Sequence, residues 1–249
     1  NRIYNDKIAD FACKIIDATD GAPIRRAEDI FDRIYIDEVQ DMAGYDLNFI
    51  ERLLDSKIHV TLVGDHRQAT FKTNQASKNR KYGGVKIIDQ FKAWETARRI
   101  DIDIHNYSHR CVQAICDFAD RFFPEADTTV SRNDTKTGHD GVFLVRERDV
   151  EKYREAFSPQ ALRYNRKTQV DERSIYNFGE AKGMTFPRVI IYPPGTLKKF
   201  IKTGKLSDAG KDLAKLYVGM TRARQSVAIV MPNGTTTSAF PQINVYQPT

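Results

Sequence analysis

Short apolar runs that end in polar side chains mark the first half of the chain. One run, residues 34–36, ends at Asp37 and Glu38, and a second, residues 58–63, ends at residues 64–68. Runs of this length between charged residues are typical of strands that are buried on both faces of a parallel sheet. The segment between them has helical spacing, so the pattern predicts a β-α-β unit whose strands deliver polar groups to one edge.

The periodicity of the rest of the chain predicts further helices and strands. Helices are expected over residues 3–16, 27–31, 47–54, 87–99, 112–119 and 208–223. Strands are expected over residues 100–104, 142–145, 161–164, 189–192 and 227–231. Alternation of this kind predicts the α/β class, with parallel sheets.

Two domains and a tail are predicted from the places where these patterns change. Apolar and polar residues alternate strictly over residues 100–104, and this segment is expected to open a second domain. The first domain is then residues 1–99 and the second residues 100–231. Residues 232–249 combine prolines and consecutive threonines without periodicity, which predicts a flexible tail.

The composition is that of a globular protein with a mildly basic balance. The 249 residues are 41% hydrophobic and 29% charged, and the net charge of +6 favours a polyanionic partner. No apolar run approaches the ~20 residues of a membrane span. The three cysteines, Cys13, Cys111 and Cys116, form no metal-type pair. These features favour a reduced, cytoplasmic protein without a membrane partner.

A basic segment with an aromatic neighbour follows the second predicted strand. Residues 72–86 contain Lys78, Arg80 and Lys81 beside Tyr82. This composition suits single-stranded nucleic acid, because phosphate contacts and base stacking add together. A solvated flexible loop accounts for the same residues equally well, and both interpretations stay open.

Asp37 and Glu38 are the strongest chemical candidates in the sequence. At the end of a parallel strand, one carboxylate can hold Mg²⁺ while the other activates a water molecule. Gln68 can hydrogen-bond a phosphate, and Arg110 and Arg222 can neutralise charge in a transition state. The alternatives are a solvated acidic turn, a surface glutamine and two ordinary helix-end cations. The order of these residues favours a nucleotide-hydrolysing site between the two domains.

Five segments resemble the motifs of one helicase family. Ile34–Met42 (IYIDEVQDM) resembles the Walker B motif of superfamily 1 DNA helicases of the UvrD/Rep type, and Leu62–Phe71 (LVGDHRQATF) resembles the motif that follows it. Asn106–Cys111 (NYSHRC), Gly179–Phe186 (GEAKGMTF) and Leu216–Arg224 (LYVGMTRAR) resemble three later motifs, in the family's order. The resemblance covers most of the chain and implies two RecA-like domains of the P-loop NTPase type.

The resemblance also implies a role for each matching catalytic residue. Asp37 would coordinate Mg²⁺, and Glu38 would activate water. Gln68 would sense the γ-phosphate of the nucleotide. Arg110 and Arg222 would be the trans-domain arginines that stabilise the transition state.

Other matching positions would bind the nucleotide or the DNA. Lys182 and Gly183 match the loop that couples the two ligands in the family. Phe71, followed by Lys72, falls where the family has an aromatic residue near the DNA path. An ungapped match places His109 at the position of the adenine-stacking aromatic residue.

Several positions depart from the family pattern. A gapped match would use Tyr107 as the stacking residue in place of the histidine. Thr73 and Asn74 stand where the family often has a tryptophan-arginine pair, which puts one stacking contact in doubt. Thr185 replaces the glutamate of the coupling loop, which puts a ribose contact in doubt.

A phosphate-binding loop of the form G-x-x-x-x-G-K-S/T does not occur in the 249 residues. Gly204–Lys211 (GKLSDAGK) is a near miss, with five residues between its glycines and Asp212 where serine or threonine belongs. The family carries this loop upstream of Walker B, and the chain starts at Asn1 rather than at a methionine. We therefore expect a fragment whose first domain is incomplete at its N-terminus and which is inactive by itself.

The sequence thus predicts a fragment of an ATP-dependent DNA helicase or translocase. Its cofactors would be ATP and Mg²⁺, and its partners single-stranded DNA or duplex/single-strand junctions. A second hypothesis is a non-hydrolysing DNA-binding or scaffolding subunit that retains the helicase fold. A third, a Mg²⁺ nuclease that uses Asp37, Glu38 and Asp41, lacks a complementary acidic cluster elsewhere in the sequence.

Overall fold

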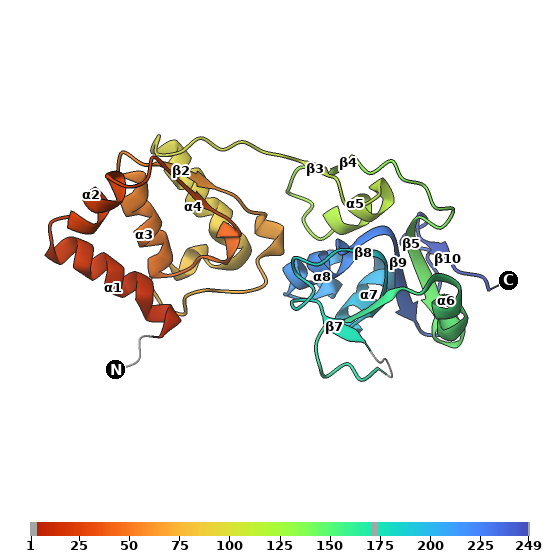
Figure 1. Ribbon diagram of the computed structural model, residues 1–249. Helices are drawn as coiled ribbons and strands as arrows, with labels where there is room; N and C mark the ends of the chain where they lie inside the picture. The colour runs from red at the N-terminus through yellow and green to blue at the C-terminus, as the bar shows by residue number, and fades with distance from the viewer. Residues whose placement is uncertain (1–3, 171–173, 249) are drawn as a thin grey trace. The chain divides into compact units, whose positions relative to one another are not determined.

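A parallel pair of strands lies at the centre of the first part of the chain. β1 (Arg33–Ile36) pairs with β2 (His59–Leu62), with Arg33 opposite His59 and Ile36 opposite Leu62. The computed structural model describes residues 4–170 and 174–248 (Figure 1). The chain divides into two compact units, Asn1–Ile104 and His105–Thr249.

Four helices accompany β1 and β2 in the described part of the first unit. They are α1 (Asn5–Ala18), α2 (Ala22–Glu28), α3 (Tyr45–Leu54) and α4 (Ile87–Thr96). Leu47 and Ile50 of α3 and Trp94 of α4 pack with Ile36 and Leu62 of the strands into one apolar core. This core fixes the carboxyl ends of both strands, which are followed by the polar segments that begin at Asp37 and Gly64.

The opposite face of the two-stranded sheet is open to solvent in the first unit. The strands alternate between exposed and half-buried residues, and the exposed set includes Tyr35, whose exposed fraction is 67%. Val63, just beyond β2, is exposed as well. Parallel strands are usually covered on both faces, and a continuous apolar run predicts burial of this kind. Here only one face of the pair is buried, so the strands are less buried than predicted.

The second unit is built on a six-stranded sheet in which every neighbouring pair is parallel. The order is β10 (Asn244–Val245), β5 (Gly141–Arg146), β9 (Ala223–Met231), β8 (Phe186–Tyr192), β6 (Gln160–Arg163) and β7 (Ile175–Asn177). A separate parallel pair joins β3 (Tyr107–Ser108) to β4 (Val130–Ser131). The predicted α/β class with parallel sheets is confirmed.

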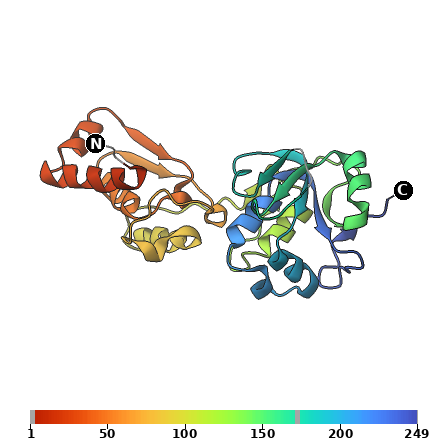
Figure 2. The same cartoon turned by 90° about the horizontal axis from the view of Figure 1, so that it is seen from below.

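Helices cover both faces of the larger sheet. The apolar residues of α5 (Gln113–Asp120), α7 (Gly195–Thr203) and α8 (Leu213–Met220) pack into one core with alternate strand residues such as Leu144 and Ile229. The intervening strand residues, Val145 and Val230 among them, pack against α6 (Val150–Phe157) on the other face. The two layers of helices are visible in Figure 1 and, seen from below, in Figure 2.

Two segments differ from what their sequence patterns predict. Part of the predicted tail packs onto the second unit: Asn244 and Val245 extend the sheet beside β5, and Phe240 and Ile243 are buried in the main core. Residues 100–104 form no strand, although their alternation predicts one. Alternation alone does not make a strand when no neighbouring strand offers hydrogen bonds.

The first helix lies where its periodicity predicts, but it buries a different face. Cys13 and Ile16 are buried, whereas Ile8, Phe11 and Ile15 are exposed. Ile3, which belongs to the predicted helix, lies outside the described residues. No helix in the described ranges is long and apolar enough to cross a membrane.

Candidate functional site

The turn after β1 presents both predicted carboxylates at the strand end. Asp37 and Glu38 are exposed, and the backbone N–H of Glu38 donates a hydrogen bond of 2.7 Å to Oδ1 of Asp37. Glu38 has a φ of 53° and a ψ of 35°, in the left-handed region that non-glycine residues seldom adopt. Such a conformation is costly and is found preferentially at functional sites. It ends β1 abruptly and begins the 3₁₀ helix Val39–Asp41.

Gln40 joins the ends of β1 and β2 and was missed as a site residue. Its exposed fraction is 1%, and its Nε2 donates to Oε2 of Glu38. Its Oε1 accepts the backbone N–H of Asp65 at 3.1 Å. One buried amide therefore holds the Glu38 carboxylate against the loop that follows the neighbouring strand.

Gly64 leaves the space that Gln40 occupies. A Cβ at residue 64 would lie 2.3 Å from Oε1 of Gln40 and 3.0 Å from Cγ1 of Val39. Real Cβ atoms do not approach oxygen this closely, so a side chain here would displace the amide. The glycine of the second motif is therefore explained by its close approach to Gln40.

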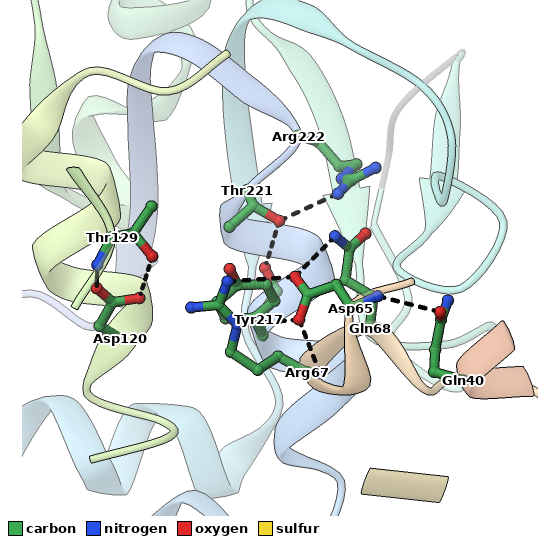
Figure 3. A network of polar contacts seen from close by, with 9 residues as sticks. All are labelled: Gln40, Asp65, Arg67, Gln68, Asp120, Thr129, Tyr217, Thr221 and Arg222. Atoms are coloured by element: carbon green, nitrogen blue, oxygen red, sulfur yellow. Dashed lines mark hydrogen bonds and ion pairs between the residues drawn. The ribbon is translucent and has the colours of Figure 1, made fainter. Parts of the chain in front are cut away.

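The loop after β2 is organised around Asp65. Its carboxylate accepts hydrogen bonds from the backbone N–H and Nε of Arg67, each at 3.0 Å, and from Nε2 of Gln68 at 3.1 Å. Figure 3 shows Arg67 and Gln68 directed toward it. Burial raises the pKa of Asp65, but the charge and hydrogen bonds of Arg67 outweigh burial, so this pKa lies below its ordinary value. The carboxylate thus fixes the amide of Gln68 while remaining ionised.

The segment after Gln68 carries an exposed aromatic ring. Phe71 is 64% exposed, and Lys72 beside it is exposed too. Thr73 turns inward, where its backbone N–H and its hydroxyl both donate to the carbonyl of Asp41, at 2.9 and 3.0 Å. Asn74 is buried and accepts the backbone N–H of Ala76. Thr73 and Asn74, which stand where UvrD/Rep-type helicases often have a tryptophan-arginine pair, therefore hydrogen-bond within this segment and support its structure.

Arg222 is buried in the turn directly before β9, with an exposed fraction of 1%. Its Nε donates to the carbonyl of Val218 at 3.1 Å, and its Nη1 to that of Met184 at 3.5 Å. Its Nη2 donates to the hydroxyl of Thr221 at 3.1 Å (Figure 3). The guanidinium thus links the end of α8 to the loop that precedes β8.

Arg110 meets the same threonine from the start of the second unit. Its Nη1 donates to the carbonyl of Thr221 at 3.2 Å, and the hydroxyl of Ser108 accepts its backbone N–H. We refer to Arg110, Thr221 and Arg222 as the arginine cluster. The structure therefore brings together the two predicted arginines, through a residue that the sequence did not single out.

The loop that carries Lys182 and Gly183 leads into Met184, which contacts Arg222. Gly183 has a φ of 81°, which a residue with a side chain rarely adopts. Glu180 steadies the loop by accepting the backbone N–H of Asn177 at 3.0 Å. That bond, together with the smaller effect of Arg166, lowers the pKa of Glu180. Lys182 is half-buried, whereas Gly183 is exposed.

The two candidates for the stacking residue differ in exposure. His109 is exposed, and its ring meets that of Tyr107 edge-on at 5.5 Å. Tyr107 is half-buried, and the guanidinium of Arg132 lies 3.4 Å from the centre of its ring. This contact occupies the tyrosine, so the accessible ring is that of the histidine.

The donor set at the end of β1 fits a magnesium ion that is shared with a nucleotide. Across residues 4–170 and 174–248, no group of three or more His, Cys, Asp or Glu side chains could hold a metal by itself. Mg²⁺ is commonly bound through one or two carboxylates, with waters and phosphates as its other ligands. Asp37, exposed at the strand end, suits that arrangement.

Comparison with known proteins identifies the family. The model of the viral superfamily 1 RNA helicase core domain matches residues 12–231, and the chain belongs to this family. Superfamily 1 is therefore confirmed as predicted, whereas the viral RNA helicase family takes the place of the UvrD/Rep type. No curated protein matches the sequence.

Solved structures of arterivirus helicases resemble the chain. One is the PRRSV helicase, with 19% identity, 82% of this chain and 36% of that chain covered, and a TM-score of 0.49. Another is arterivirus nonstructural protein 10 in complex with DNA, with 20% identity, 80% and 39% covered, and a TM-score of 0.49. The chain spans less than two fifths of the length of either helicase.

Proposed function

We propose that the chain is part of a motor that couples hydrolysis of a nucleoside triphosphate, ATP in the first instance, to movement along single-stranded nucleic acid. The observation that carries this proposal is the buried Gln40 amide, which holds Glu38 beside the Asp65–Gln68 loop. A solvated acidic turn would not need a buried side chain that hydrogen-bonds to residues at the ends of two strands. The family, whose members are helicases, supports the same activity.

Each candidate residue then has a task in hydrolysis. Glu38 accepts the proton of the attacking water, and Gln68, held by Asp65, orients that water and the γ-phosphate. Asp37 would hold Mg²⁺, which supplies charge neutralisation on the phosphates. Arg110 and Arg222 stabilise the negative charge that develops on the transferred phosphoryl group. His109 offers its exposed ring to the base.

Residues 1–249 contain no phosphate-binding loop, so we propose that hydrolysis also needs a loop from outside this sequence. Without it, the phosphates have no backbone cradle and no lysine. The chain alone is then expected to hydrolyse ATP no faster than buffer does. Robust turnover by residues 1–249 that disappears in Glu38→Gln would contradict this part of the proposal.

In a longer chain that supplies the loop, Glu38→Gln should reduce kcat by roughly 10²–10⁴, because general base catalysis contributes about that factor. Glu125→Gln removes one exposed carboxylate in the second unit and is the matched control. The measurement is steady-state phosphate release with saturating single-stranded nucleic acid. Equal rates in the two variants would show that Glu38 is not the general base, and a wild-type chain with the loop that releases no phosphate would favour a non-hydrolysing binding subunit.

The nucleic acid is proposed to be single-stranded RNA, because the family is one of RNA helicases, with DNA as the alternative ligand. Phe71 offers an exposed ring for base stacking, and Lys72 and Lys182 offer cations for phosphates. Binding is expected to weaken as salt rises, as for any contact that releases counterions.

Phe71→Ala should weaken binding of a labelled 20-nucleotide strand by about 5- to 160-fold, because stacking one base contributes roughly 1–3 kcal/mol. Tyr35→Ala removes an equally exposed ring from the open face of the β1–β2 sheet and should leave affinity unchanged. Fluorescence anisotropy with RNA and DNA strands of the same sequence measures both effects. Equal losses of affinity in the two variants would show that Phe71 does not stack on a base.

A further inference from the structure

A short segment after α5 runs beside β3 and is anchored to the helix. The backbone N–H and the hydroxyl of Thr129 donate to the carboxylate of Asp120, at 2.6 and 2.9 Å (Figure 3). Nε2 of Gln113 donates to the carbonyl of Thr129 at 2.9 Å, and its Oε1 accepts the N–H of Ser131 at 2.7 Å. We refer to residues 129–133 as the strap. The side chains of α5 thus fix the beginning of the strap.

The strap also pairs with the segment that carries Arg110. The N–H of Val130 donates to the carbonyl of Asn106 at 2.8 Å. The N–H of Arg132 donates to the carbonyl of Ser108 at 2.7 Å. These are backbone hydrogen bonds of the parallel pair β3–β4, so the strap has a fixed register against the residues that precede Arg110.

The last residue of the strap, Asn133, joins the two arginine-bearing segments. Its Nδ2 donates to the carbonyl of Arg110 at 2.7 Å and to the carbonyl of Arg224, in β9, at 3.2 Å. Its Oδ1 accepts the N–H of Thr135 at 3.1 Å, which sets the orientation of the amide. The carbonyl of Arg224 also accepts the N–H of Val112 at 3.0 Å. One side chain therefore links the backbone of Arg110 to the beginning of β9.

The two arginines of the cluster need a fixed separation to act on one phosphoryl group. Arg222 stands two residues before Arg224, and the side chains of Arg110 and Arg222 both donate to Thr221. Asn133 holds the backbone of Arg110 and of Arg224 at once, so its loss would let the two guanidinium groups move apart. A misplacement of about 1 Å in an active site can lower the rate roughly 10²-fold.

We propose that Asn133 is a positioning residue for hydrolysis and that its amide sets the spacing of Arg110 and Arg222. This role rests on the proposed function, in which both arginines stabilise charge on the transferred phosphoryl group. The amide acts through two backbone carbonyls and not on the nucleotide itself. Sequence patterns gave no signal for it, because its two partners lie 23 and 91 residues away along the chain.

Hydrogen exchange of the 249-residue chain tests the link between the segments without any hydrolysis. Asn133→Asp keeps the acceptor for the N–H of Thr135. It replaces the donor by a second oxygen, which repels the carbonyls of Arg110 and Arg224. The N–H of Val112, which donates to the carbonyl of Arg224, should then exchange at least about tenfold faster than in the wild type. Unchanged exchange would overturn the proposal, because Asn133 would not be holding that carbonyl.

Asn165→Asp is the matched control for this change. Oδ1 of Asn165 accepts the N–H of Lys167 at 3.0 Å, a hydrogen bond that aspartate keeps. The N–H of Val112 should therefore exchange in this variant as it does in the wild type. Equal acceleration in both variants would overturn the proposal, because the cause would be the added charge and not the lost donor.

Steady-state hydrolysis by a longer chain that supplies the phosphate-binding loop tests the role in catalysis. Groups that stabilise charge in the transition state affect kcat more than KM. Asn133→Asp should therefore lower kcat about 10- to 100-fold and change KM for ATP by less than about twofold. Asn165→Asp should leave both parameters unchanged. A wild-type kcat in Asn133→Asp would overturn the proposal.

A double variant separates positioning from general damage to the fold. In an Arg110→Ala background no guanidinium remains at this position to be misplaced. Adding Asn133→Asp to that background should therefore lower kcat by a factor at least about threefold smaller than in the wild type. Equal factors in the two backgrounds would mean that Asn133 acts independently of Arg110, and the proposal would be overturned.

The same variants distinguish a failure of this proposal from a failure of the proposed function. An unchanged kcat in Arg110→Ala would show that this arginine has no part in hydrolysis, and the positioning role would fall with it. A large loss in Arg110→Ala beside a wild-type kcat in Asn133→Asp would overturn the positioning role alone.

Discussion

At the scale of single residues, Gln40 makes the sharpest prediction. Gln40→Leu keeps a buried side chain but removes the acceptor of the N–H of Asp65 and the hydrogen bond that Gln40 donates to Glu38. An unsatisfied buried group costs about 1–3 kcal/mol, so the free energy of unfolding of the first unit should fall by that amount. Trp94, the chain's one tryptophan, is buried in the same unit and reports its unfolding by fluorescence in denaturant.

Gln75→Leu is the matched control for this change. Gln75 is exposed in the same unit, so its replacement should alter the free energy of unfolding by less than about 0.5 kcal/mol. If Gln40→Leu were as mild as the control, the amide would not be holding the two strand ends together.

The residues that sequence patterns identified are those whose chemistry is unusual for their position. Asp37 and Glu38 follow an apolar strand directly, and Arg222 stands in a distinctive Thr-Arg-Ala-Arg segment. Gln40 and Thr221 lie inside the same segments, yet their importance comes from partners distant in sequence, the N–H of Asp65 and the guanidinium of Arg110. Tertiary hydrogen bonds of this kind leave no local pattern.

At the scale of elements, strands were predicted best where apolar residues run without interruption. Residues 189–192 and 227–231 correspond to the ends of β8 and β9, which are buried in the sheet. The helices α6 and α7 were missed, because few buried residues identify them: Tyr153 in α6, and three residues among the lysines of α7. A helix that lies on a sheet with most of its surface in solvent gives only a weak apolar period.

A further prediction concerns the stability contributed by the C-terminal segment, residues 232–249, for which the sequence predicted flexibility. Phe240 packs against Phe118 and Phe200, with ring centres 5.5 and 5.0 Å apart. Phe240→Ala should lower the free energy of unfolding of the second unit by about 3–5 kcal/mol, as for other buried phenylalanines. Far-UV circular dichroism in denaturant measures the loss.

Gln242→Ala provides the comparison for the tail, because this side chain is exposed two residues away. It should change stability by less than about 0.5 kcal/mol. A tail that is loosely attached would instead show two equally small effects, and the packing of Phe240 would then be irrelevant to stability.

At the scale of the whole molecule, pH should act on stability through a histidine far from the candidate site in sequence. His139 lies between the rings of Phe143 and Phe157, stacked at 3.8 and 3.7 Å, and its Nε2 lies 2.9 Å from the hydroxyl of Tyr153. Burial and the charge of Arg188 lower the pKa of His139 to about 4, while Asp140 opposes them weakly. The folded chain therefore holds this imidazole neutral at pH values where the unfolded chain protonates it.

The sign of the effect follows from linkage. Because the pKa of His139 is lower in the folded chain than its ordinary value of 6.5, its full contribution is present above that pH. Stability then falls as the pH drops toward 4. The lowered pKa of Asp65 acts in a different window, because its stabilisation is lost only as the pH falls below 3.8. Between pH 7 and pH 5, the change in stability therefore reports the protonation of His139 and not that of Asp65.

His139→Gln should therefore flatten the pH dependence of unfolding. Between pH 7 and pH 5, each unit of pKa difference corresponds to about 1.4 kcal/mol, and partial solvent exposure of the ring reduces the expected difference to about 1 kcal/mol. The variant should lose that much less stability than the wild type over the interval, measured by denaturant unfolding followed by far-UV circular dichroism. Because His66, whose pKa is also lowered by burial, is present in both proteins, its contribution cancels in the comparison. Parallel pH profiles for the two proteins would mean that protonation of His139 does not affect stability and that its ring contributes only packing.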